Sequence, residues 1–176
     1  MPRSAPYRQS RGGCQQRPSV AARRPRCHGR VTAKGRVYKG YDAMQVVGLC
    51  RFSYPAEGGF QIEHDTLEAR RAFLYDPERL AERFRHFEAI TLPGLTAQTD
   101  PDFEFLIVIG DDLPDPWLAR LMDLVAGFPQ ARVLAEAPGP HRQVMQKVLN
   151  RAREGRDDLC LQFRHDDDDA VAVDFV

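Results

Sequence analysis

The stretch FEFLIVI, from Phe103 to Ile109, is the clearest β-strand in the sequence. Every residue in it except Glu104 is apolar, and aromatic and β-branched side chains are favoured in strands. A strand that is apolar at consecutive positions is typical of a parallel sheet that is covered on both faces. This stretch therefore predicts a buried central strand and a fold of the α/β class.

Further strands and helices alternate along the chain on either side of this stretch. Short apolar runs predict strands at Gln45–Cys50, Arg132–Ala135 and Leu159–Phe163. Two helices are predicted where an acidic residue and a proline precede apolar positions at helical spacing, at Asp76-Pro77-Glu78 before Leu80, Phe84 and Phe87, and at Asp115-Pro116 before Leu118, Leu121, Met122 and Val125. Pro93-Gly94 is expected to interrupt or end the first helix, and a third carries Val144, Met145, Val148, Leu149 and Ala152. The order predicts an open, mostly parallel sheet with helices on both faces.

A run of four aspartates, Asp166–Asp169, directly follows the last predicted strand. Ligands of such sheets bind outside the carboxyl ends of the strands, where Arg51-Phe52-Ser53 and Asp111-Asp112 are also expected. Carboxylate oxygens are ligands for Mg²⁺ or Mn²⁺, and a cation relieves the repulsion among adjacent carboxylates. Because residues i and i+2 of an extended segment face the same way, Asp166 and Asp168 are expected to share the cation, with Asp167 and Asp169 facing elsewhere. The alternative interpretation is a solvated acidic loop.

The net charge of zero conceals a strong asymmetry along the chain. Residues 1–43 contain eleven Lys or Arg and one acidic residue, a formal charge of +10, whereas residues 44–176 carry −10. The first segment has no apolar periodicity, so we expect a disordered basic arm before a folded region at 44–176. Clustered arginines could neutralise nucleic-acid phosphates, but nothing beyond charge supports this, and we expect no nucleic-acid partner.

Cysteine usage and hydropathy bear on the cellular location. The four cysteines form no C-x-x-C pair, so a zinc site or disulfide framework is not expected. The sequence has no apolar run of roughly 18 residues, the minimum for a membrane-spanning helix, and the basic arm has no signal-peptide core. We therefore expect a reducing cytoplasm.

Four stretches, taken in order, carry a resemblance to a known family. Phe163–Ala170, with the aspartate run, resembles the DXD-bearing segment of the putative rhamnosyltransferase family of bacterial glycosyltransferases. Gly48–Ser53 resembles the family's opening strand and loop, Leu92–Thr99 its SL-x-x-QT segment, and Phe103–Pro114 the next strand and its exit. The resemblance covers roughly residues 44–176, with His165 standing where the family has an apolar residue.

The resemblance implies a GT-A fold and transfer of a sugar from a nucleotide-diphosphate donor, a UDP- or dTDP-sugar. It implies that Asp166 contacts the ribose or the metal and that Asp168 binds Mg²⁺ or Mn²⁺. It also implies that Arg51 and Ser53 lie near the nucleotide and Asp111 near the base. By comparison with the family we expect the chain to lack the C-terminal half, which supplies the acceptor site and the catalytic base, so no base is assigned.

Two other functions compete with a glycosyltransferase. One is a non-catalytic remnant, or a nucleic-acid-binding protein that uses the basic arm. The other is a cation-dependent phosphohydrolase, which would need acidic residues from several strand ends, whereas the sequence has one dense cluster. The donor sugar, the acceptor and the oligomeric state are not determined by the sequence.

Overall fold

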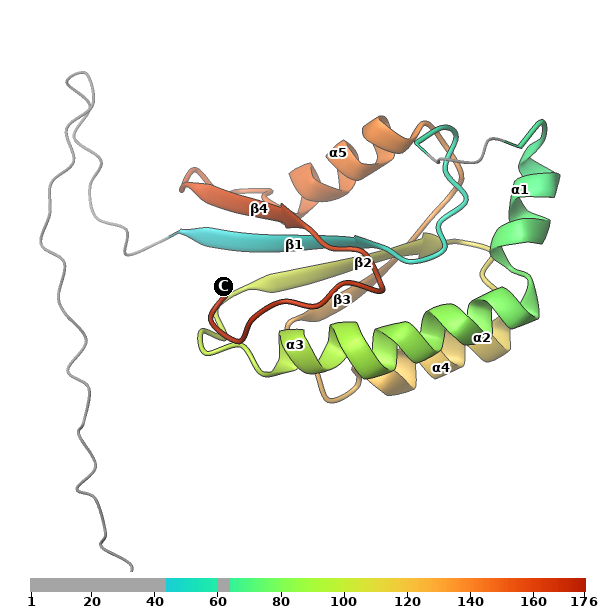
Figure 1. The fold of residues 1–176 in the computed structure, drawn as a ribbon. Helices are drawn as coiled ribbons and strands as arrows, with labels where there is room; N and C mark the ends of the chain where they lie inside the picture. The colour runs from blue at the N-terminus through green and yellow to red at the C-terminus, as the bar shows by residue number, and fades with distance from the viewer. Residues whose placement is uncertain (1–43, 60–63) are drawn as a thin grey trace, which may run out of the picture. The chain divides into compact units, whose positions relative to one another are not determined.

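The computed structural model describes residues 44–59 and 64–176. The expected basic arm, residues 1–43, lies outside the described residues, so the prediction of its disorder is not tested. The described residues form one compact α/β unit, with a sheet between two helical layers (Figure 1).

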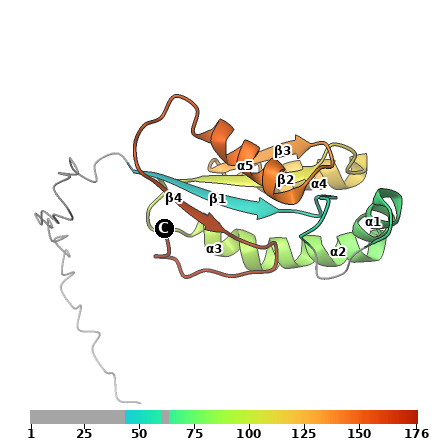
Figure 2. The same ribbon diagram turned by 90° about the horizontal axis from the view of Figure 1, so that it is seen from above.

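Four parallel strands form the sheet. They are β1 (Gln45–Arg51), β2 (Glu104–Gly110), β3 (Ala131–Glu136) and β4 (Cys160–Arg164), in the order β3-β2-β1-β4. Figure 2 shows β1 lying between β4 and β2. The predicted strands are thus confirmed to within about one residue at each end, and the mostly parallel sheet is parallel throughout.

The strand FEFLIVI is buried on both faces, as its composition predicted. Phe105, Ile107 and Ile109 belong to the larger hydrophobic cluster, and Leu106 and Val108 to the smaller cluster on the opposite face. All five are at most 1% exposed. A strand whose consecutive side chains are all buried requires a helical layer on each face, because successive side chains point to opposite faces.

The helices supply those two layers. The chain forms α1 (Leu67–Leu74), α2 (Pro77–His86), a π-helical turn η2 (Phe87–Thr91), α3 (Leu92–Thr96), α4 (Asp115–Val125) and α5 (His141–Ala152). Figure 1 shows α5 on one face of the sheet and α2, α3 and α4 on the other. The prediction of helices on both faces is confirmed.

The helix that begins at Pro77 is interrupted before Pro93-Gly94 but does not end there, because the π-turn η2 separates α2 from α3 and Pro93 falls in the first turn of α3. A proline is tolerated there, since the amide it lacks is not needed. Met122, expected on the buried stripe of α4, is 50% exposed.

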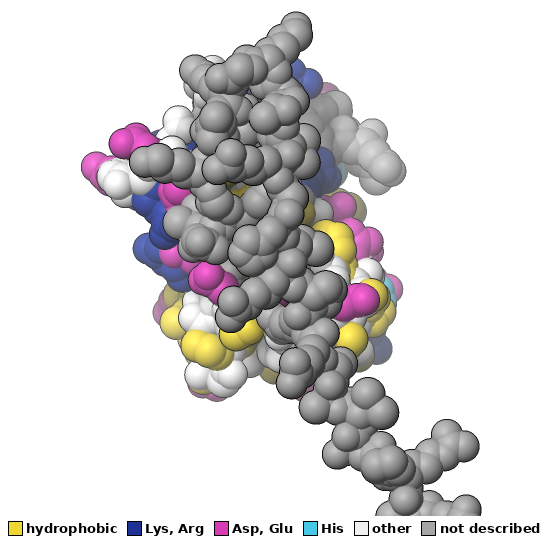
Figure 3. All heavy atoms as spheres, turned by 90° about the vertical axis from the view of Figure 1, so that its left-hand side faces the viewer, with side chains coloured by type: hydrophobic (Ala, Val, Ile, Leu, Met, Phe, Trp, Pro, Cys, Tyr) yellow, Lys and Arg dark blue, Asp and Glu magenta, His cyan; other side chains and the backbone are white. Residues whose placement is uncertain are grey.

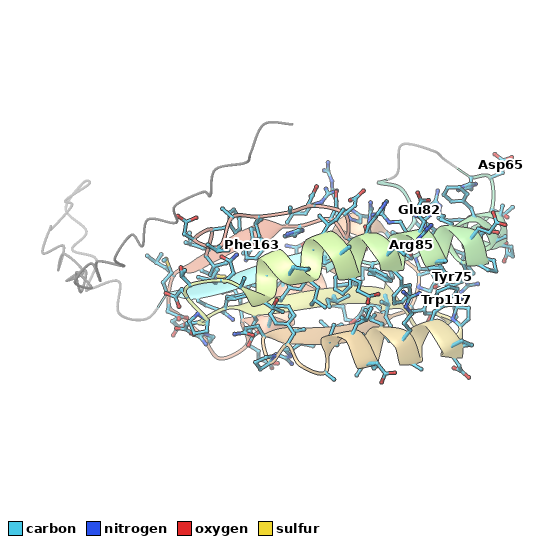
Figure 4. All side chains as sticks on the ribbon, turned by 60° about the horizontal axis from the view of Figure 1, so that its bottom comes forward. Asp65, Tyr75, Glu82, Arg85, Trp117 and Phe163 are labelled. Carbon is cyan, nitrogen blue, oxygen red and sulfur yellow. The ribbon has the colours of Figure 1, made fainter. Side chains whose placement is uncertain are left out.

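Aromatic rings tie α2 to the sheet and to α4. The Phe84 ring lies 4.9 Å from that of Phe52 and 5.3 Å from that of Trp117, centroid to centroid. Trp117 therefore packs against the core, as expected, and Figure 4 shows it at α4 beneath α2. Because Phe84 is fully buried, α2 is rigidly placed relative to β1.

The face at the amino ends of the strands is viewed in Figure 3. Where the grey residues leave it visible, acidic and basic side chains lie next to one another.

Within the part of the chain that the structure describes, no helix is both long and apolar enough to cross a membrane.

Candidate functional site

The sheet order creates a switch point at the carboxyl ends of β1 and β4. The chain passes from β1 to β2 and β3 on one side, and then returns through α5 to β4 on the other side of β1. In open α/β sheets, ligands bind in the crevice where the strand order reverses. Arg51 ends β1 and the aspartate run follows β4, so the topology brings these two segments together.

The aspartate run forms a turn and is not extended. The amide of Asp169 donates to the carbonyl of Asp166 at 3.2 Å, and the amide of Asp166 donates to Asp169 Oδ2 at 3.2 Å. The alternation argued from an extended chain was therefore wrong as a geometric reason. The expected separation of Asp167 from the other two is not confirmed: its side chain is 4% exposed, against 45% and 42% for Asp166 and Asp168, but all three residues line one cavity.

Arg83 of α2 binds two members of the run. Its Nε donates to Asp167 Oδ2 at 2.8 Å, its Nη2 pairs with Asp167 Oδ1, and its Nη1 donates to Asp168 Oδ2 at 3.0 Å. Burial alone would raise the pKa of the Asp168 carboxyl group, but the hydrogen bond and charge of Arg83 outweigh burial and lower this pKa. Asp168 is therefore an anion at neutral pH.

A cavity of about 210 Å³ opens beside the run. Its walls include Arg51, Ser53, Asp166 and Asp168, four of the five residues that the sequence assigned to the site. Ser53 is buried in the left-handed region with φ 48°, which few residues other than glycine adopt, and its Oγ accepts a hydrogen bond from Arg79 at 3.1 Å. The loop after β1 is thus held in a sparsely populated conformation at the site.

A second cavity of about 440 Å³ lies against α5, and Arg51 lines both cavities. Its charged walls are cationic, with Arg142 and Arg164 beside Arg51, and His141 adjoins them. Burial, and then the positive charge of Arg51, Arg164 and Arg142, lower the pKa of His141. Such a cavity suits an anion such as a phosphate. The positively charged start of α5, at His141 and Arg142, therefore lines a cavity.

Asp111, the fifth predicted residue, lines neither cavity. It is exposed at the end of β2, and its amide donates to the carbonyl of Glu136 at 3.2 Å. Its neighbour Asp112 accepts a hydrogen bond from Tyr75 at 2.8 Å and pairs with Arg71 at 2.5 Å. The structure therefore leaves Asp111 at the margin of the site.

Sequence reasoning missed the residues that hold the segment after β4. Figure 1 shows this segment turning back along α2 and α3. Thr91 donates to the carbonyl of Asp169 at 3.0 Å, and Gln98 donates to that of Ala172 at 2.8 Å and accepts from the amide of Val176 at 2.9 Å. The SL-x-x-QT-like segment was a usable signal for Gln98, but no local pattern marks Arg83 or Thr91 as partners of the run.

His165 is buried, at a position where the resemblance led us to expect an apolar residue. Its ring meets those of Phe105 and Phe163 edge to face, at 5.8 and 6.5 Å between centroids, and its Nδ1 lies 2.8 Å from the carbonyl of Asp166. The imidazole thus fills an aromatic niche while binding the first carbonyl of the turn. Its presence is compatible with the packing before the aspartates.

The carboxylates present suit a hard divalent cation. Asp166 and Asp168 offer oxygen ligands at the wall of one cavity. Among residues 44–59 and 64–176, no group of three or more His, Cys, Asp or Glu is arranged to enclose a metal ion. Mg²⁺ is usually bound by one or two protein carboxylates, and water or phosphate oxygens occupy its remaining coordination positions.

Comparison with known proteins agrees with the family resemblance. Residues 45–176 match the family described as "Putative rhamnosyl transferase", a range that includes all four strands and the aspartate run. No curated protein and no solved structure matches the chain. On the strength of this match over most of its length, the chain belongs to the putative rhamnosyl transferase family.

Proposed function

We propose that this chain binds a nucleoside-diphosphate sugar at the β1–β4 switch point, with Mg²⁺ or Mn²⁺ on Asp166 and Asp168, for transfer of the sugar. The observation that carries the proposal is the meeting of Arg51, Ser53 and the aspartate run around one cavity, at the edge of the sheet where such folds bind ligands. The family to which the chain belongs supports the same class of reaction.

The two cavities support a division of roles within the donor site. The cationic cavity beside α5 can neutralise phosphate oxygens through Arg51, Arg142 and Arg164. Burial, and then the charge of Arg164, lower the pKa of the Arg51 guanidinium, although it remains protonated at neutral pH. An incoming diphosphate would relieve the repulsion between Arg51 and Arg164, which favours an anion at this position.

The carboxylate side of the site would hold the cation. Asp166 and Asp168 are half exposed, so their oxygens can reach an ion without unfolding the turn. A bound divalent cation supplies positive charge to stabilise the departing diphosphate. Asp111, exposed at the end of β2, is retained as the residue near the base.

Calorimetry with UDP- and dTDP-sugars, in Mn²⁺ and then in excess chelator, tests the proposal. We expect donor binding to require the cation, because the run without metal repels a diphosphate. Asp168→Asn should remove most metal-dependent binding. Asp167→Asn should have a smaller effect, because Asp167 is buried against Arg83.

Asp157→Asn is the matched control, since Asp157 is exposed in the loop before β4, at the opposite end of that strand from the run. This control should bind the donor as the wild type does. Equal donor affinity with and without the cation, or undiminished binding by Asp168→Asn, would reject the metal site.

The cytoplasmic location expected from the cysteines is part of the same proposal.

A further inference from the structure

Arg83 is held by the fold and not by the loop that it binds. It lies on α2 next to Phe84, which is fully buried against Phe52 and Trp117. The guanidinium is therefore presented to the aspartate run from a rigid helix. Thr91, farther along the same helical stretch, fixes the run a second time through the carbonyl of Asp169.

The three nitrogen contacts of Arg83 are of two kinds. Two of them form a fork on Asp167, whose side chain is 4% exposed, and such a bidentate pair in a buried position is not easily replaced. The third contact, from Nη1 to Asp168 Oδ2 at 3.0 Å, is made to a carboxylate that is 42% exposed. Exposed ion pairs are weak, so the second contact can exchange its partner while the first persists.

The Asp168 contact conflicts with a metal ion on the same carboxylate. A divalent cation on Asp168 would lie close to the guanidinium of Arg83, and like charges at short range repel. An anion in the cavity resolves the conflict, since Arg83 lines that cavity together with Arg51 and Arg79. Nη1 can donate to a phosphate oxygen in place of Asp168 Oδ2, while Nε and Nη2 keep their fork on Asp167.

We propose that Arg83 is a positioning residue that withholds Asp168 from the cation until a diphosphate arrives, so that metal and donor bind cooperatively. The inference rests on the proposed function, because it assumes a metal site at Asp166 and Asp168. Arg83 acts through Asp168 in this scheme. By linkage, a diphosphate that replaces Asp168 as the partner of Nη1 raises metal affinity, and the metal raises diphosphate affinity by the same factor.

The test compares Mn²⁺ binding, measured by electron paramagnetic resonance of the free ion, with and without saturating UDP. Removing Arg83 alone would leave the buried Asp167 carboxylate without its partner. The variant is therefore the double substitution Arg83→Met with Asp167→Asn. The protein with Asp167→Asn alone is the reference for it. We expect the double variant to bind Mn²⁺ alone about 1.4- to fivefold more tightly than the reference, which is the effect of losing one exposed ion pair. We also expect UDP to enhance Mn²⁺ binding less in the double variant than in the reference.

Arg85→Met is the matched control, since Arg85 is exposed on the same helix (Figure 4). It should leave both Mn²⁺ affinity and the UDP effect unchanged. Arg83→Lys, which keeps the charge but not the fork, should retain weak Mn²⁺ binding in the absence of UDP.

The outcomes separate the two proposals. If the wild type binds Mn²⁺ no better with UDP than without it, and Asp168→Asn changes nothing, the metal site itself is rejected. If the wild type shows metal-dependent UDP binding but the double variant matches the reference in Mn²⁺ affinity and in the UDP effect, Arg83 has no gating role and the proposed function stands. Thermal melting of each variant verifies that it is folded at the temperature of the measurement.

Discussion

Gly48, in the middle of β1, offers a direct test of how the sheet supports the aspartate run. It pairs laterally with Phe105 of β2 and Phe163 of β4, and the rings of these two residues stack at 6.4 Å between centroids. A methyl group added at Gly48 would lie 2.4 Å from Phe163 Cζ and 2.7 Å from Phe105 Cδ2. Both rings would have to move, and Phe163 is three residues before Asp166.

We expect Gly48→Ala to destabilise the protein by about 1–3 kcal/mol, the usual cost of overpacking a core. For a folded region of this size that corresponds to a fall of roughly 3–12 °C in Tm, to be measured by circular dichroism. In the Phe163→Leu background the same substitution should cost less, because the ring that it meets has been removed.

Gly127→Ala is the matched control, since no atom lies within 4 Å of the added methyl group, and it should change stability by no more than about 0.5 kcal/mol. If Gly48→Ala melted like the wild type, or cost as much in the Phe163→Leu background, the argument that the two rings close over Gly48 would be refuted.

Two further predictions concern the pH dependence of the run and the basic arm. The pKa of Asp168 is lowered in the folded state, so its ion pair with Arg83 stabilises the protein fully above the ordinary value of 3.8 and less as the pH falls through the folded pKa. In thermal unfolding measured below pH 3.8, the difference in Tm between the wild type and Asp168→Asn should therefore become smaller. A difference in Tm that stays constant with pH would contradict a stabilising ion pair between Asp168 and Arg83. A protein that begins at Met44 should unfold within about 0.5 kcal/mol of the full chain in urea, because residues 1–43 have no apolar periodicity, and a larger loss would make the arm part of the fold.

Local sequence patterns determined the fold class of this protein. The burial of Phe103–Ile109 on both faces follows from consecutive apolar residues, and the start of α2 follows from Asp76, whose side chain accepts from the amide of Arg79 at 3.0 Å, and from Pro77. These signals act between residues a few positions apart, so they are visible without a structure. The same holds for placing Asp166–Asp169 at the carboxyl end of a strand, because a run that directly follows a parallel strand must lie there.

Only the tertiary structure decided which side chains face the run. Arg83 is 84 residues from Asp167 in sequence. Helical spacing places Arg83 beside the apolar stripe and Arg85 on the exposed side of the helix, but it does not tell which residue Arg83 binds. The π-turn η2 carries the helix past Pro93, and the aspartates form a turn where an extended segment was expected. The cationic cavity likewise arises only when β4 lies beside β1, which brings Arg164 and Arg51 to the same crevice as Arg142. Contacts of this kind form only when whole helices and strands pack against one another. Their free energy depends on residues far apart in sequence, so no short stretch of sequence determines them.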